Sequence, residues 1–207
     1  MHNITLKVYF ITYIEYPSSI MNVLIIYYST NGSTKKMARL IARGVENIDG
    51  ANAILRTVPN NQKNTDDSDP LVINEDLKDC SALLIGSPTH FGNMAAPMKA
   101  FIDTTTAEWY NGVLCGKPAG VFTSTSSLHG GQESTLLSMM LPLLHHGMIL
   151  SGVPYSNKIL NTTKTGGTPY GPSHVSFNGK NDISEDEKEI CMSFGERIAE
   201  LAKKLDN

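Results

Sequence analysis

Hydroxyl and amide side chains crowd one short segment of the chain, which consists of Ser29, Thr30, Asn31, Gly32, Ser33 and Thr34. An apolar run at residues 23–28 precedes this segment, as expected of a parallel strand buried on both faces. Apolar residues at helical spacing follow it, namely Met37, Ile41, Val45 and Ile48. A helix N-terminus offers unpaired backbone N–H groups and partial positive charge, so the segment is placed to bind an anion. The sequence therefore predicts a phosphate-binding loop.

The composition of this loop limits the kind of phosphate. It contains no Lys or Arg and matches neither the nucleotide triphosphatase pattern nor the dinucleotide-binding glycine pattern. Hydroxyls and backbone N–H groups alone suit a terminal monophosphate. The alternative is an ordinary turn in which a Ser or Thr caps the helix.

Two further loops follow apolar runs and carry similar groups. The first contains Pro88, Thr89, His90, Phe91 and Gly92, and the second contains Ser124, Thr125, Ser126, Ser127, Leu128 and His129. Each loop alone is more often a solvated turn. Because the carboxyl ends of parallel strands meet at one edge of a sheet, we expect the three loops to outline a phosphate at one end and a flat heterocycle at the other.

Composition excludes several classes of function. The chain has 207 residues, 41% of them apolar and 18% charged, with a net charge of −3. That charge gives no basic surface for nucleic acid, and no run approaches the ~20 apolar residues of a membrane span. The three cysteines form no C-x-x-C pair, which favours a reducing, cytoplasmic location and no metal site.

The first twenty residues are interpreted separately from the rest. Residues 8–14 are apolar and resemble a weak signal peptide, but the run is closed early by Glu15 and lacks a good cleavage site. We expect residues 1–20 to be a poorly ordered extension, Met21 to be a possible true start, and residues 21–207 to form one domain.

Strand and helix patterns alternate along that domain. Five apolar runs predict strands, at residues 23–28, 53–58, 82–87, 119–123 and near 148–150. Apolar residues at helical spacing predict helices at residues 34–48, 74–79, 96–106, 132–145 and in a final segment. A capping box, Ser184 to Glu187, opens the final helix, and Pro142 should kink the fourth. The pattern predicts an α/β fold, a doubly wound parallel sheet with helices on both faces. Two polar stretches, 60–70 and 151–182, interrupt the alternation, and the second is long enough to be functional or an interaction surface.

Five segments together resemble one family, the WrbA-type flavodoxin-like NAD(P)H:quinone oxidoreductases (type IV, historically called tryptophan-repressor-binding protein). These segments are YYSTNGSTKKMA, GSPTHFGNM, GKPAGVFTSTSSLHGGQE, HHGM and GGTPYG. The resemblance runs from about Asn22 to Leu205. It implies a flavodoxin-like fold of five strands in the order 2-1-3-4-5, bound FMN, NADH or NADPH as electron donor, a quinone substrate, and a homotetramer or homodimer.

The resemblance also implies roles for individual residues. Residues 29–34 would hold the FMN phosphate, and residues 124–129 would line the pyrimidine side of the isoalloxazine ring and the ribityl chain. Thr89, His90 and Phe91 would border the isoalloxazine ring, and the flanking Pro88 and Gly92 would also belong to the cofactor site. His145 would approach the flavin from a neighbouring subunit and could donate a proton to the quinone. Asn31 would contact nicotinamide, and Trp109 would contact substrate. The alternatives are a packing role for Trp109 and a structural or surface role for the adjacent His145 and His146.

Three positions depart from the family pattern. His90 stands where arginine is usual, Asn31 stands where tyrosine is frequent, and the loop at 124–131 is one residue longer. The first two departures could weaken cofactor or nicotinamide contacts without changing the fold.

The implied reaction is two-electron, ping-pong reduction of a quinone to a hydroquinone, with NAD(P)H and quinone using the same place in turn. Two other functions are compatible with a flavin site: a flavodoxin-type single-electron carrier, and a regulatory protein that binds flavin without turnover. The modest net charge gives little of the charged docking face that a carrier needs.

Overall fold

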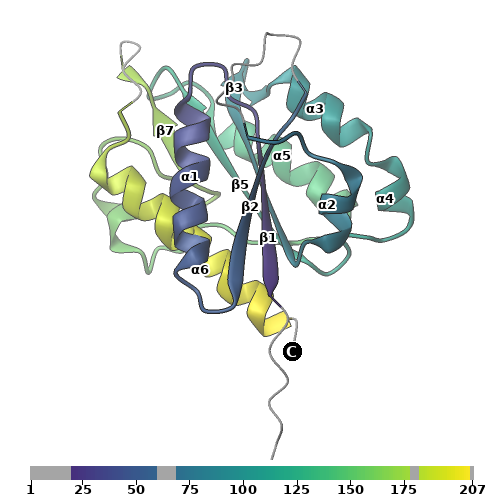
Figure 1. Cartoon of the computed structure of the whole chain (residues 1–207). Helices are drawn as coiled ribbons and strands as arrows, with labels where there is room; N and C mark the ends of the chain where they lie inside the picture. The colour runs from purple at the N-terminus through teal and green to yellow at the C-terminus, as the bar shows by residue number, and fades with distance from the viewer. Residues whose placement is uncertain (1–19, 60–68, 178–181, 206–207) are drawn as a thin grey trace, which may run out of the picture.

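The computed structural model describes residues 20–59, 69–177 and 182–205, and its centre is one twisted sheet (Figure 1). Five strands form the main path in the order β2-β1-β3-β5-β6. Their bounds are Met21–Tyr27 (β1), Ala51–Thr57 (β2), Ala82–His90 (β3), Pro118–Thr125 (β5) and Ile149–Leu150 (β6). Counted along the chain, this is the predicted order 2-1-3-4-5, and all four pairings on the path are parallel. The predicted α/β class is confirmed.

Helices cover both faces of the sheet, as Figure 1 shows. Helices α1 (Ser33–Glu46) and α6 (Glu185–Leu205) lie on one face. Helices α2 (Asn74–Asp79), α3 (Ala96–Asp103) and α5 (Gln132–His145) lie on the other, and α4 (Thr106–Tyr110) contacts α2. No helix in the described ranges is both long and apolar enough to cross a membrane.

Strand β1 explains why the sheet needs a helix layer on each side. Val23 and Ile25 belong to the apolar cluster beneath α1 and α6, whereas Leu24 and Ile26 belong to the cluster beneath α2, α3 and α5. All four side chains are almost fully buried. The continuous apolar run in the sequence is therefore read correctly as a strand buried on both faces.

The predicted count of five strands is wrong, because two short strands bring the sheet to seven. Strand β4 (Asn93–Met94) runs antiparallel to β3. Its two-residue turn is Phe91-Gly92, where both residues have positive φ (52° and 73°), as in the type I′ turns that favour hairpins. The sequence pattern suggested a loop here because a two-residue strand carries no periodicity.

The second extra strand, β7 (Ser173–Val175), divides the last position of the sheet between two pieces. Strand β6 pairs with the start of β5, Ile149 opposite Pro118, and β7 pairs with its end, Ser173 opposite Thr123. The intervening segment, 151–172, contains the 3₁₀ helix η1 (Lys158–Asn161). The long polar stretch predicted at 151–182 thus contains an insertion into the fifth strand position, residues 151–172, after which residues 173–175 return to the sheet.

Other expectations have mixed outcomes. The predicted helix at 96–106 is two helices, since the Thr104 and Thr105 hydroxyls donate to the carbonyls of Phe101 and Ile102 and compete with the helical pattern there.

The capping box that opens α6 is confirmed by reciprocal bonds between Ser184 and Glu187. Helix α5 is helical on both sides of Pro142, and the kink there stays a prediction. Residues 1–19 of the expected extension and most of the polar stretch at 60–70 lie outside the described residues.

Candidate functional site

The loops after β1, β3 and β5 meet around a cavity of about 670 Å³ at the carboxyl edge of the sheet. This volume lies within the usual range of small-molecule pockets. The lining residues are Tyr28, Ser29, Thr30, Asn31, Ser33, Thr34, Pro88, Thr89, His90, Ser124, Thr125, Ser126 and Ser176. The three loops that the sequence suggested are therefore brought to one place, and hydroxyl groups dominate its wall.

Buried hydroxyls join these loops to one another. The Thr34 and Ser124 hydroxyl oxygens are 2.9 Å apart, which connects the loop after β1 with the loop after β5. The Thr89 and Thr123 hydroxyl oxygens are 3.2 Å apart, and the Thr123 hydroxyl donates to the Ser87 carbonyl oxygen at 2.7 Å. The cavity wall is held by the sheet as well as by the loops.

The start of α1 leaves its backbone groups available to a ligand. Gly32 occupies the N-cap position with a φ of 87°, and no side-chain cap hydrogen bond is present at this described helix end. The Gly32 N–H donates to the Ser29 hydroxyl at 3.1 Å, which folds the loop back on itself. An uncapped helix start beside the cavity is a suitable seat for an anion. Gly32 itself does not line the cavity wall, although Asn31 and Ser33 on either side of it do.

The loop after β3 brings an aromatic side chain to the rim. His90 lines the cavity, and the next residue, Phe91, is fully exposed with a φ of 52°. A left-handed backbone at an aromatic residue is an outlier that often marks a functional position. Gly92 lies outside the wall, where its Cα faces Gly131 at the start of α5.

The loop after β5 divides into two parts. Ser124, Thr125 and Ser126 line the cavity, whereas Ser127, Leu128 and His129 are exposed beyond it. The buried Gln132 side chain donates to the carbonyl oxygens of Ser127 and Leu128, at 3.2 and 2.7 Å. This outer part is thus anchored to the first turn of α5.

Two residues that line this cavity, Tyr28 and Ser176, were not predicted from the sequence. Ser176 follows β7, and its hydroxyl oxygen lies 3.0 Å from that of Ser33 and 3.1 Å from His174 Nε2. The alternation of polar and apolar residues at His174, Val175, Ser176 and Phe177 is the signal that could have indicated a strand there. That signal is four residues long and stands inside a stretch that otherwise reads as loop.

Behind Ser176 lies a buried hydrogen-bonded pair, His174 and Glu187. His174 Nδ1 is 3.0 Å from Glu187 Oε2, and both side chains are almost completely buried. Burial alone would raise the pKa of Glu187, but hydrogen bonds from His174 and from the Ser184 and Val175 N–H groups outweigh it, and the pKa is lowered. Glu187 is therefore a carboxylate acceptor as well as the second residue of the capping box.

The structure places Trp109 and His145 away from this cavity within one chain. Both line a separate cavity of about 440 Å³ formed by α3, α4 and the end of α5. Helix α5 begins beside the loop after β5, and His145 is its last residue, roughly 20 Å further along at 1.5 Å per residue. Any contact of these two residues with a ligand in the larger cavity requires a second copy of the chain.

The neighbouring His146 has a different environment from exposed His145. Its Nε2 lies 3.0 Å from the Thr105 hydroxyl, and its Nδ1 is buried with no hydrogen-bond partner among the described residues. Burial lowers the pKa of His146, an effect that nearby Glu108 opposes. Both histidines nevertheless line the same smaller cavity.

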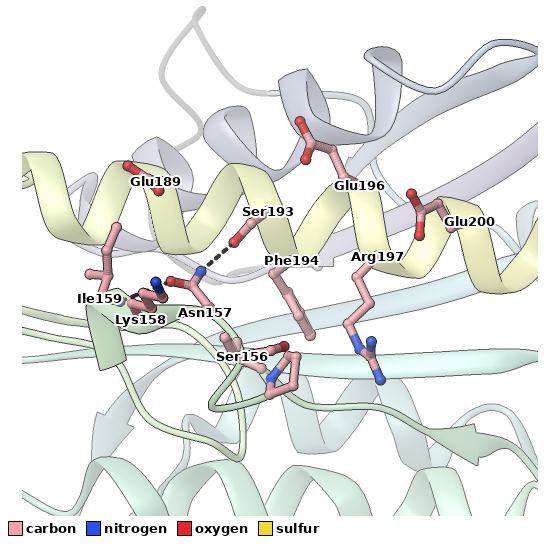
Figure 2. A pocket seen from close by; sticks show the side chains of 12 residues that line it. Ser156, Asn157, Lys158, Ile159, Glu189, Ser193, Phe194, Glu196, Arg197 and Glu200 are labelled. Carbon is pink, nitrogen blue, oxygen red and sulfur yellow. Dashed lines mark hydrogen bonds between the residues drawn. The ribbon is translucent and has the colours of Figure 1, made fainter. Parts of the chain in front are cut away.

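A further cavity, of about 520 Å³, lies between the inserted segment and α6. Figure 2 shows Phe194 and Arg197 pointing from α6 toward the loop that carries Ser156, and Asn157 hydrogen-bonded to Ser193 at 3.0 Å. Its charged side chains have both signs, and none of its residues was identified from the sequence as a site residue.

Comparison with known proteins gives one family match and several close relatives. A family model described as NADPH-dependent FMN reductase matches residues 21–159. A curated relative from Solidesulfovibrio magneticus, named NAD(P)H dehydrogenase (quinone), is 41% identical over 202 residues and covers 89% of this chain and 99% of its own. A relative of the same name from Syntrophobacter fumaroxidans is 40% identical, with 89% and 98% coverage.

Solved structures agree on the fold. A flavodoxin, WrbA-like protein from Agrobacterium tumefaciens matches with a TM-score of 0.66 and 24% identity over 89% of this chain and 98% of that chain. An archaeal flavodoxin matches with a TM-score of 0.62 and 21% identity, over 88% and 99%. The chain has a flavodoxin-like fold.

Proposed function

The chain belongs to the NADPH-dependent FMN reductase family, and on this basis we propose that it is a flavin-dependent oxidoreductase that transfers electrons from NAD(P)H to quinones. The large cavity at the carboxyl edge of the sheet would hold the flavin. Position supports this assignment, because ligands of open α/β sheets bind outside the carboxyl ends of the strands.

The observation that carries the proposal is the uncapped start of α1 beside a wall of hydroxyls. Ser33, Thr34 and Ser124 are buried there, and Ser176 joins them from β7. None of the described residues that line this cavity is Lys or Arg. Such a wall fits one phosphate group that is held by backbone N–H and hydroxyl donors.

The proposed flavin is FMN. Among the described lining residues, those at 29–34 supply one anion seat, and Pro88, Thr89 and His90 form another part of the wall. A terminal monophosphate would occupy the first position, and a flat ring would lie against the second, with exposed Phe91 at its border. Bound FMN would supply the electron transfer between NAD(P)H and quinone, which the side chains of the cavity do not supply.

The protein's own contribution would be orientation and hydrogen bonding. The hydroxyl of Thr125 and the exposed side chain of Ser126 stand where donors could face the pyrimidine side of the ring. NAD(P)H and quinone would occupy the same open face in turn, and Asn31, which lines the cavity, would contact the nicotinamide. This shared place is the reason to expect ping-pong kinetics.

A second copy of the chain would complete the substrate side. Leu137, Leu141 and Leu144 form an exposed apolar row along α5, close to exposed Trp109. Patches of this kind often mark protein interfaces. We therefore retain the homotetramer or homodimer as the proposed assembly, in which His145 and Trp109 of one copy would approach the flavin cavity of another.

Two smaller expectations accompany the proposal. Strand β1 begins at Met21, so residues 21–207 should be sufficient to bind the flavin. The described structure leaves Cys80, Cys115 and Cys191 as free thiols, which supports a reducing, cytoplasmic location.

The test is steady-state kinetics of the FMN-loaded protein with NADH or NADPH and a benzoquinone. Turnover with double-reciprocal lines that stay parallel as the second substrate is varied supports a ping-pong mechanism in which NAD(P)H and quinone use one binding site in turn. Intersecting lines reject that mechanism. Absence of turnover unless a separate reductase is added would instead identify an electron carrier, and absence of turnover under every condition would identify a binding protein.

A further inference from the structure

A chain of hydrogen bonds leads from the buried interior to the cavity wall. It starts at Glu187 on α6, passes through His174 on β7, continues to Ser176 and ends at Ser33 in the first turn of α1. The three links measure 3.0, 3.1 and 3.0 Å. His174 and Glu187 are almost fully buried, while Ser33 and Ser176 line the cavity.

The Glu187 carboxylate determines which group donates at its end of this series of hydrogen bonds. Glu187 Oε1 accepts hydrogen bonds from the Gly166 and Val175 N–H groups, at 2.9 and 3.2 Å, and Oε2 accepts one from the Ser184 N–H at 2.8 Å. With every contact donating to it, and with its pKa lowered, the carboxylate is acceptor-only. His174 must then carry a proton on Nδ1 and donate it to Oε2.

The direction of the remaining bonds depends on the other ring nitrogen. In the neutral imidazole Nε2 is an acceptor, so the Ser176 hydroxyl donates to it and the Ser33 hydroxyl donates to Ser176. Both hydroxyl protons then point away from the cavity. In the imidazolium Nε2–H donates to Ser176, and the Ser176 and Ser33 protons are released to face the cavity.

We propose that His174 is a positioning residue that couples phosphate binding to uptake of a proton: a dianionic phosphate bound at Ser33 and Ser176 is accompanied by protonation of His174 Nε2. The proton comes from solvent and no covalent bond changes. This inference rests on the proposed flavin site, because FMN supplies the phosphate. It explains how a cavity wall without Lys or Arg among its described residues gains a positive charge when the anion arrives.

The ionisable groups around His174 are consistent with this role. Helix α6 contributes Glu187 and also Cys191, a fully buried thiol whose pKa is raised by burial and by the Glu187 charge. Helix α1 contributes Ser33 at this point, and Lys35 and Lys36 follow within the same first turn. Strand β5 places neutral Ser124 beside His174 in the sheet. Glu187 is thus the anionic group that would face His174 when its Nε2 takes up a proton.

The experiment compares FMN with riboflavin, which lacks the phosphate, by titration calorimetry of the apoprotein in buffers of different ionisation enthalpy. At about pH 8, where a phosphate monoester is already a dianion, FMN binding should take up about one proton, and riboflavin binding should take up none. Nitrogen-15 spectra of the histidine rings should show one ring gaining a second N–H upon FMN binding.

The variant Ser176→Ala interrupts this series of hydrogen bonds between His174 and Ser33 and leaves the His174–Glu187 hydrogen bond intact. It should weaken FMN binding by roughly 10- to 100-fold, as for a lost hydrogen bond to a charged acceptor, abolish the proton uptake and leave riboflavin affinity unchanged. Ser193→Ala, which removes an α6 hydroxyl at the cavity of Figure 2, is the control and should match the wild type.

The outcomes separate this inference from the proposed function. FMN binding without proton uptake, or proton uptake that persists in Ser176→Ala, overturns the role of His174 and leaves the flavin site standing. Failure of the folded protein to bind FMN at all overturns the flavin site, and the inference falls with it.

Discussion

The indole N–H of Trp109 donates a hydrogen bond of 2.7 Å to the backbone carbonyl oxygen of His145. This bond ties α4 to the last turn of α5 and fixes the two residues side by side. They are the two positions that the family resemblance assigned to substrate and flavin contacts from outside the cofactor loops. Because both line the same smaller cavity, a second copy of the chain that brings one of them to a flavin cavity would bring the other close to it.

The first prediction concerns assembly. The mass of the protein should exceed one subunit and rise with concentration, because the apolar row on α5 is exposed in the single chain. Leu141→Glu places a charge in that row and should shift the mass toward one subunit. Leu205→Glu changes a similarly exposed leucine at the end of α6 and is the control. Sedimentation over a range of concentrations measures both, and a wild type that is monomeric throughout would remove Trp109 and His145 from the site.

The second prediction concerns the phosphate seat. Gly32→Val should weaken FMN binding by about tenfold or more, the equivalent of one hydrogen bond to a charged group, because a β-branched residue resists the φ of 87° that sets the start of α1. Gly116 is a matched control, since its φ is 78° and a Cβ there would also meet open space. Gly116→Val carries the same backbone cost away from the cavity. Equal FMN affinity in the two variants would contradict the placement of the phosphate.

The third prediction concerns acid stability. Because the pKa of Glu187 is lowered in the folded protein, the unfolded chain binds a proton there first as the pH falls. The stabilisation is therefore complete above about pH 4.5 and is lost as the pH drops through the lower folded value. Glu187→Gln puts an amide where the Ser184 N–H and His174 donate to a carboxylate, so it should reduce the free energy of unfolding at neutral pH by roughly 1–3 kcal/mol and flatten the acid dependence.

Urea unfolding at a series of pH values tests this. Glu200→Gln, an exposed carboxyl on the same helix, should leave both the midpoint and its pH dependence close to those of the wild type. An unchanged acid slope in Glu187→Gln would assign acid sensitivity to other groups, among which His146 is a candidate because burial lowers its pKa.

The fourth prediction concerns the packing of α1 on α6. Alanine is a better helix former than glycine by about 1 kcal/mol, so Gly44→Ala would ordinarily stabilise α1. Here a Cβ at Gly44 would overlap the Met192 carbonyl oxygen of α6. We expect a loss of about 1–3 kcal/mol from overpacking, against a change within about 0.5 kcal/mol for exposed Arg43→Ala. Thermal unfolding decides the sign, and a gain in stability would show that the helices can move apart.

Several helices and strands of this protein can be predicted from patterns that span only a few consecutive residues. The apolar run of β1, the helical spacing of Met37, Ile41 and Val45, and the capping box of α6 each depend on neighbours within a few residues, so they could be predicted. The position of the hydroxyl-rich loop at residues 29–34 between a strand and a helix start could be predicted for the same reason, because these residues are consecutive.

Tertiary structure decided what depends on distant partners. Strand β7 has three residues and exists because β5 offers it a hydrogen-bonding edge, and Ser176 reaches Ser33 across a separation of 143 residues. Likewise, β6 and β7 share one strand position only because both pair with β5. Local patterning carries no information about such contacts, since the free energy that forms them comes from burial and pairing that exist only once the sheet has assembled.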